Sequence, residues 1–148
     1  MKTKQTNFSC LTAKLDIIVA VQRELNLKKV YSDGYVQDVG ITCEAYSLLA
    51  LPRKNLLIWG ERKCERILKV PLTKLWNSGS EGKFLLRGVP FPAALAYLET
   101  QDLLLWVDRD EKTLRYIRLN ETVSWYHRKG KLVRNLTFMP YDLLIVGG

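Results

Sequence analysis

The sequence repeats itself at an interval of 47 residues, and this repeat limits the folds that the chain can adopt. Residues 56–59 (LLIW) match residues 103–106 (LLLW), and the pattern of charged and apolar residues that follows each segment also corresponds. With one residue inserted, the Gly-Lys pair at 82–83 matches the pair at 130–131. Each copy has the pattern of a β-meander in which an apolar strand ends in Trp and a charged turn follows. A meander cannot bury its apolar face alone, so we expect the two copies to pack or pair with each other.

The segment 10–29 has a different pattern and predicts an amphipathic helix. Its apolar residues recur at spacings of three and four, which is the period of one helix face; they are Leu11, Leu15, Ile18, Val21 and Leu25. Ser9 is placed to cap the helix at its N-terminus, and Lys28 and Lys29 would complement the helix dipole at its C-terminus. We expect this helix to cover one face of a sheet.

Short runs rich in β-branched and aromatic residues follow, and they predict strands. The predicted strands are 35–39, 41–46, 56–59, 67–72, 84–87, 103–107, 114–119, 123–128 and 132–138. Residues 92–101 fit a short helix, and they fit a strand nearly as well. The expected fold class is therefore α+β. In it, the N-terminal helix packs on a mainly antiparallel sheet built from two similar meander units of about 47 residues. We place the first unit at 52–98 and the second at 99–148, within a single domain covering 1–148.

Composition and cysteine usage give an expectation for the compartment. The chain has 148 residues, of which 47% are hydrophobic, so it is long and apolar enough to bury a core without a metal or disulfide staple. The N-terminus is polar, and the best apolar run near it, Leu15 to Val21, contains Asp16 and is too short to span a bilayer, so we expect neither a secretory signal nor a transmembrane helix. The three cysteines (Cys10, Cys43, Cys64) are an odd number with no CxxC pair, so we expect free thiols. These features favour a cytoplasmic protein.

Catalytic motifs are scarce. The only histidine, His127, lies in a predicted strand, and no phosphate-binding glycine motif or zinc-protease motif occurs. One metal-dependent reading remains, a nuclease in which Asp38 and the Glu61-Arg62-Lys63 segment hold a divalent cation. Glu81-Gly82-Lys83 is a second acid-x-Lys segment. Because Glu61 recurs as Asp108 in the second copy, a turn residue is the simpler interpretation. We therefore expect a non-enzymatic protein without a metal or other cofactor.

The positive charge is concentrated in the first unit. The whole chain carries a net charge of +8, and the segment 52–98 holds nine basic and three acidic residues, a net +6. A second basic cluster surrounds the predicted hairpin turn near residue 130, next to an aromatic run. The predicted binding residues are Arg53, Lys54, Arg62, Lys63, Arg66, Lys69, Lys83, Arg87, Tyr126, Arg128, Lys129 and Lys131.

Basic residues beside aromatic rings on a sheet are typical of proteins that bind single-stranded nucleic acid, since cations follow the phosphates and rings stack on bases. The first hypothesis is therefore a binding module for single-stranded RNA or DNA, or another polyanion such as an acidic protein surface. The alternative is a protein–protein interaction or assembly module that uses sheet edges and the N-terminal helix, with self-association through those edges.

Overall fold

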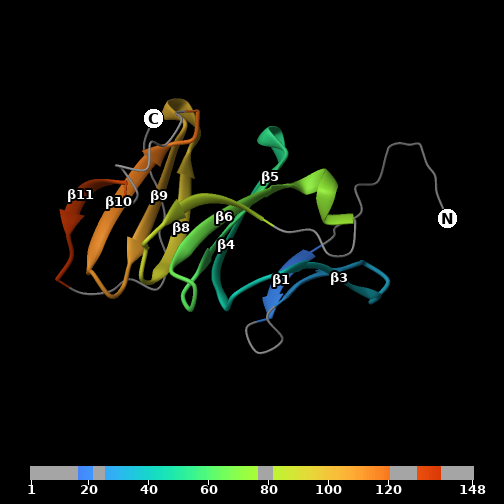
Figure 1. The fold of residues 1–148 in the computed structure, drawn as a ribbon. Coiled ribbons are helices and arrows are strands. Elements are labelled where there is room, and N and C mark those ends of the chain that lie inside the picture. Colours follow the sequence, from blue (N-terminus) through green and yellow to red (C-terminus); the bar gives the residue numbers. More distant parts are fainter. Residues whose placement is uncertain (1–16, 22–25, 77–81, 121–129, 138–148) are drawn as a thin grey trace.

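The part of the chain that the structure describes is mostly β. The computed structural model describes residues 17–21, 26–76, 82–120 and 130–137, which form three antiparallel sheets (Figure 1). The first sheet contains β1 (Ile17–Val21), β2 (Asn26–Val30) and β3 (Val36–Ile41). The second contains β4 (Ala45–Leu51), β5 (Leu56–Glu61), β6 (Arg66–Pro71) and β7 (Lys83–Arg87). The third contains β8 (Pro92–Leu98), β9 (Leu103–Asp108), β10 (Thr113–Arg118) and β11 (Lys131–Asn135).

The prediction of an N-terminal helix, and with it the α+β class, is wrong. Within the predicted helix, β1 and β2 pair antiparallel, with Ile17 opposite Val30. The run 17–21 (IIVAV) is largely β-branched and favours an extended backbone, which overrides the three-and-four spacing once a partner strand is available. Among the described residues, the only helices are three 3-10 turns: η1 (Pro52–Lys54), η2 (Leu72–Trp76) and η3 (Glu99–Gln101). None of the described helices is long and apolar enough to cross a membrane.

The second and third sheets are copies of each other. We call β4–β7 the first meander and β8–β11 the second meander. Both have strands in sequence order, and both have a 3-10 turn between their first two strands. Each meander begins one strand before the predicted unit. The first opens with β4 at 45–51 rather than at residue 52, and the second opens with β8 at 92–98 rather than at residue 99. The predicted strand 41–46 is likewise misplaced, since β4 occupies 45–51. The predicted strand 123–128 lies outside the described residues.

The repeat extends to irregular backbone features. Asn55 and Asp102, 47 residues apart, both adopt a left-handed conformation after their 3-10 turns, with φ of 53° and 55°. The opening strand of each meander has a register shift at Tyr46 and at Ala93 respectively. The outer strands β7 and β11 carry matching shifts at Leu85 and Val133. Bulges at corresponding places indicate one strand pattern used twice.

The sheets pack in the order of the chain. A core around Leu27, Leu57 and Trp59 lies between the first sheet and the first meander. A second core, which includes Ile58 and Trp106, lies between the two meanders. Each meander therefore turns its Trp toward the preceding sheet. Consecutive four-stranded meanders whose outer strand leads into the next opening strand are arranged like neighbouring blades of a β-propeller.

Candidate anion-binding pocket

A basic pocket lies where the β5–β6 turn meets the outer strand β7. Its volume is about 380 Å³, and it is lined by Lys63, Cys64, Glu65, Arg66, Phe84, Arg87 and Gly88. We call it the Phe84 pocket. The turn contributes Lys63 and Cys64, and the strand pairing of β6 with β7 brings Arg66, Phe84 and Arg87 to the same place. Three of the seven lining residues are cationic and one is acidic.

Two guanidinium groups lie against the Phe84 ring. The Cζ atom of Arg87 is 3.7 Å from the ring centroid, and that of Arg66 is 5.2 Å from it. An arginine stacked on a ring keeps the N–H groups at its edge available to donate to an anion. Phe84 itself is 46% exposed, so part of its ring remains accessible to a ligand. The pocket thus combines donors for an anion with aromatic surface.

Arg66 and Arg87 are direct cross-strand partners. Like charges in this position repel each other and destabilise the pairing. Arg66 is compensated, because its Nε is bonded to the carboxylate of the fully buried Glu61. Glu61 is fixed in turn by Trp59, whose Nε1 donates to it at 2.8 Å. Among the described residues, no carboxylate is paired with Arg87 or Lys63, so the pocket keeps an excess of positive charge.

The second meander provides a natural comparison, because it has the same backbone but not the same pocket. The positions that correspond to Lys63 and Cys64 hold Asp110 and Glu111. Those that correspond to Arg66 and Arg87 are Thr113 and Asn135, which are also cross-strand partners. Leu132 stands in the position of Phe84. Every cation and the aromatic ring are therefore replaced, so the fold does not require them.

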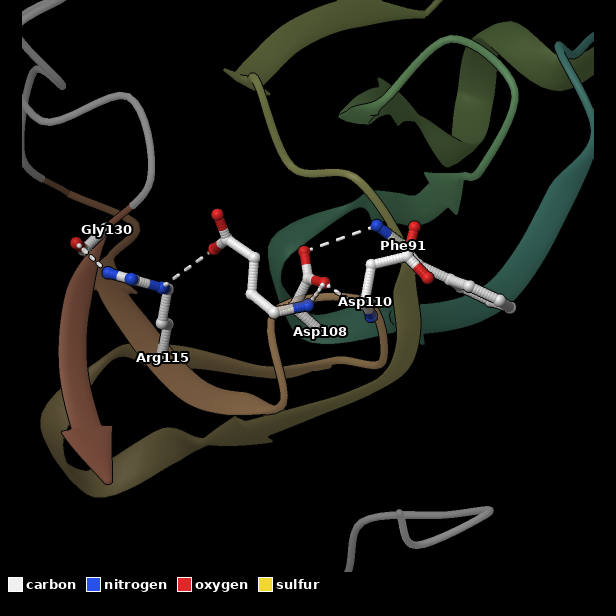
Figure 2. Close-up of polar contacts among 6 residues, drawn as sticks. Phe91, Asp108, Asp110, Arg115 and Gly130 are labelled. Carbon is white, nitrogen blue, oxygen red and sulfur yellow. Dashed lines mark hydrogen bonds and ion pairs between the residues drawn. The ribbon is translucent and has the colours of Figure 1, made fainter. Parts of the chain in front are cut away.

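In the turn after β9, Asp108 occupies the position that Glu61 has in the first meander, and there its role is only structural (Figure 2). The Asp108 carboxylate corresponds to Glu61 but is one methylene shorter. It accepts backbone N–H bonds from Phe91 at 3.2 Å, Asp110 at 3.0 Å and Glu111 at 2.9 Å. It thereby closes its own turn, whereas Glu61 reaches across to an arginine. The two tryptophans differ accordingly. The indole N–H of Trp59 donates to Glu61, whereas that of Trp106 has no acceptor within the described part of the chain.

The predicted binding residues divide into separate groups. Lys63, Arg66 and Arg87 line the Phe84 pocket, and Arg62 lies in the same turn with its guanidinium 4.6 Å from the Phe91 ring centroid. Lys69 and Lys83 face each other across β6 and β7, on the sheet face that Ile58 directs toward the second meander. Lys131 is exposed on β11. Tyr126, Arg128 and Lys129 lie outside the described residues.

Arg53 and Lys54 lie at the opposite end of β5, about 20 Å from the pocket given the rise of a six-residue strand. They join the two meanders. Arg53 pairs with Glu99 at 3.1 Å, and Lys54 with Asp102 at 2.9 Å. These pairs border a smaller pocket of about 310 Å³, which is also lined by Leu51, Pro52 and Tyr97. Since both cations are matched by acids of the second meander, they are poorly suited to hold a polyanion.

Asp102 is the centre of this junction. The Tyr97 hydroxyl donates to its carboxylate at 2.6 Å, alongside Lys54. Burial opposes ionisation of Asp102, but the hydrogen bonds from Tyr97 and Lys54 outweigh it, and the pKa of Asp102 is lowered. The hydrogen bond to Asp102 raises the pKa of Lys54. Burial, reinforced by Asp102, raises the pKa of Tyr97.

The residues of the nuclease interpretation have other partners. Asp38 pairs with Lys28 at 2.7 Å in the first sheet, and Glu61 is occupied by Trp59 and Arg66. Glu81 lies outside the described residues. The side chains of Cys43, Glu61 and Cys64 lie close enough to hold a metal ion. The two sulfur atoms, however, form a disulfide.

Sequence reasoning missed two features of the pocket. Phe84 was expected only as a strand residue, because its place beside two arginines depends on the β6–β7 register. The expectation of free thiols was wrong for Cys43 and Cys64, whose Cα atoms lie 5.8 Å apart in the folded chain. Neither a protein-family model nor a curated protein matches the sequence.

Proposed function

We propose that the first meander binds single-stranded nucleic acid through the Phe84 pocket. The observation that carries the proposal is the pairing of Arg66 with Arg87 beside an exposed Phe84, in a meander whose structural copy has Thr113, Asn135 and Leu132 at the same positions. Because Glu61 already compensates Arg66, the positive charge that remains beside Phe84 is that of Arg87 and Lys63, and an anion bound there would compensate it.

The chemistry of the pocket fits a phosphodiester chain. Lys63 supplies a flexible point charge for one phosphate, and the edge of the Arg87 guanidinium can hold another in a bidentate manner. The accessible part of Phe84 and the planes of the guanidinium groups offer stacking surface for a base. No described side chain in the pocket is an amide suited to read base edges, so we expect little sequence preference. The proposed function is binding, and it invokes no catalytic group or cofactor.

An acidic protein surface is the competing partner, and assembly through sheet edges is the competing mode. The edge mode is disfavoured because both outer strands carry a bulge, at Leu85 in β7 and at Val133 in β11, and bulges interrupt pairing with an added strand. The accessible Phe84 ring favours a nucleic acid over an acidic peptide.

The test is a pair of charge reversals at turns that correspond in the two meanders. Lys63→Glu alters the pocket, whereas Lys112→Glu alters the corresponding turn of the second meander by the same net charge. Lys112 corresponds to Glu65, so the fold already accommodates glutamate there. Binding of a labelled single-stranded oligonucleotide is followed by fluorescence anisotropy at low salt. We expect Lys63→Glu to weaken binding about tenfold and Lys112→Glu to change it by less than about twofold.

Equal effects of the two substitutions would show that only net charge matters, and would overturn the proposal. Binding of a poly-glutamate peptide with an affinity equal to that of the oligonucleotide would instead identify the acidic-protein partner. The expected cytoplasmic location is part of the proposal, since RNA and single-stranded DNA are accessible there.

A further inference from the structure

A disulfide forms part of the wall of the Phe84 pocket. Cys64 lies between Lys63 and Glu65 in the exposed β5–β6 turn, and it is bonded to the half-buried Cys43 in the segment that precedes β4. In the second meander, Pro90 stands in the position of Cys43 and Glu111 in the position of Cys64. The disulfide is therefore, like the cations around it, a feature of the first meander alone.

The fold does not depend on this bond to close the turn. The amide N–H of Arg62 donates to the Glu44 carbonyl at 3.2 Å, and in the second meander the N–H of Arg109 donates to the Phe91 carbonyl at 3.0 Å. The same junction is thus closed in both meanders, once with a disulfide beside it and once without. Because Cys64 is exposed and the turn does not require its disulfide, the bond can undergo thiol–disulfide exchange without loss of the turn.

The surroundings of Cys64 favour attack by an anion. Thiol–disulfide exchange begins when a thiolate approaches one sulfur atom in line with the bond. An approach through the pocket passes Lys63, Arg66 and Arg87. The nearby acids are Glu65, which lines the pocket, Glu61, whose charge is matched by Arg66, and Glu44, which follows Cys43 in the chain. A reagent that carries a carboxylate or sulfonate in addition to its thiolate would be concentrated there.

We propose that Cys64 is a thiol–disulfide exchange site selective for small anionic thiols. The thiolate attacks the Cys64 sulfur, a new S–S bond joins reagent and Cys64, and the Cys64–Cys43 bond breaks with its electron pair leaving on the Cys43 sulfur. A second thiolate of the same class then attacks the reagent sulfur and releases Cys64 as a thiolate. The protein gains two electrons in total, and two molecules of reagent leave as one disulfide.

The mixed disulfide would also regulate the pocket. A reagent bonded to Cys64 places its own negative charge beside Lys63 and Arg87, where the proposed nucleic acid would sit. The inference uses the same pocket as the proposed function, and the exchange itself does not require nucleic acid to bind. In a reducing cytoplasm, the anionic thiols present there would open the bond, and the disulfide that two such thiols form would close it again by the reverse exchange.

The experiment compares exchange rates with three thiols of different charge: 2-mercaptoethanesulfonate, 2-mercaptoethanol and cysteamine. Each rate is divided by the thiolate concentration and by the rate with an uncharged small disulfide, which removes differences in intrinsic nucleophilicity. At low salt we expect the anionic thiol to exceed the cationic one by about tenfold or more, and the ratio to approach one at about 1 M salt. Peptide mass spectrometry should locate the trapped adduct on Cys64.

Variants make the test specific. Arg87→Asn should reduce the preference for the anionic thiol, and Lys112→Glu in the second meander should not. Equal rates for the three thiols, an adduct on Cys43, or protein isolated in air with both thiols free would overturn the inference. Oligonucleotide binding by the Cys43→Ser/Cys64→Ser variant is measured in parallel. If this binding persists without any charge preference in exchange, only the exchange inference fails; a charge preference without binding refutes only the proposed function.

Discussion

Arg66 on β6 lies directly opposite Arg87 on β7, and the guanidinium groups of both lie against the ring of Phe84. Two cations in this relationship are costly unless something compensates them. The buried Glu61 compensates the first, while the second remains at the mouth of a pocket that also holds Lys63. The corresponding pair in the second meander, Thr113 and Asn135, carries no charge.

Arg87→Asn installs the residue that the second meander has at the same place. Arg87 is exposed, so we expect the melting temperature to remain nearly unchanged. Loss of one phosphate contact should lower the slope of log K against log salt by about one, because fewer counterions are released. Anisotropy titrations at several salt concentrations measure this slope. Arg134→Asn, on the exposed β11 strand, is the matched control and should leave it unchanged.

Glu61→Gln separates stability from binding. Gln can still accept the hydrogen bond from Trp59, but Arg66 loses its counter-charge while it faces Arg87. We expect the free energy of unfolding, measured by urea denaturation, to fall by about 2–4 kcal/mol. Oligonucleotide affinity of the folded variant should stay the same or rise, since the pocket becomes more positive. A loss of affinity at full folding would contradict the assignment of Glu61 as a structural residue.

Gly130→Ala tests the contact that repeats in both meanders. A Cβ atom at Gly130 would overlap the Trp106 ring, as one at Gly82 would overlap Trp59, and Gly130 also has a φ of +69°. Overlap with a buried ring and backbone strain together should cost about 3 kcal/mol. Gly34→Ala is the control, because its φ is +90° and nothing lies within 4 Å of an added Cβ. It should cost only about 1 kcal/mol in the same denaturation experiment.

Asp102→Asn tests the junction between the meanders. Because the folded pKa of Asp102 is below its ordinary value of 3.8, the carboxylate adds stability above that pH and loses it as the pH falls through the folded pKa. We expect the variant to be less stable by about 1 kcal/mol near neutral pH, and the difference to disappear in acid well below pH 3.8. Asn is the residue at the corresponding position 55 and tolerates the left-handed backbone. A difference that persists in acid would assign the effect to packing.

The repeat was visible in the sequence because it lies in local patterns. The match of 56–59 with 103–106 places two buried strands at the same point of each meander, and the glycines at 82 and 130 pack on the tryptophans of those strands. The residue at which each repeat unit begins was not visible. The segment 45–51 contains no Trp and no turn signal, so the sequence pattern leaves the opening strand of the first meander outside the first unit and places that of the second meander, 92–98, inside it.

Other features depend on pairing between distant residues. The run 17–21 takes its conformation from β2, and a helical spacing in one segment does not reveal a partner strand. The Phe84 pocket depends on a bulge at Leu85, which turns Phe84 and Arg87 to the same face. The distribution of charge along the sequence identified all three of its cations, but it also selected Arg53 and Lys54, which the fold uses to join the meanders.

The most direct test of the central claim is to locate bound nucleic acid on the protein. A single-stranded oligonucleotide that carries photoreactive 4-thiouridine is cross-linked at low salt, and the modified peptides are identified by mass spectrometry. The pocket predicts adducts within residues 62–66 and 83–88, and their loss in the Lys63→Glu variant. Adducts confined to the second meander, or none at an oligonucleotide concentration that saturates the anisotropy signal, would contradict it.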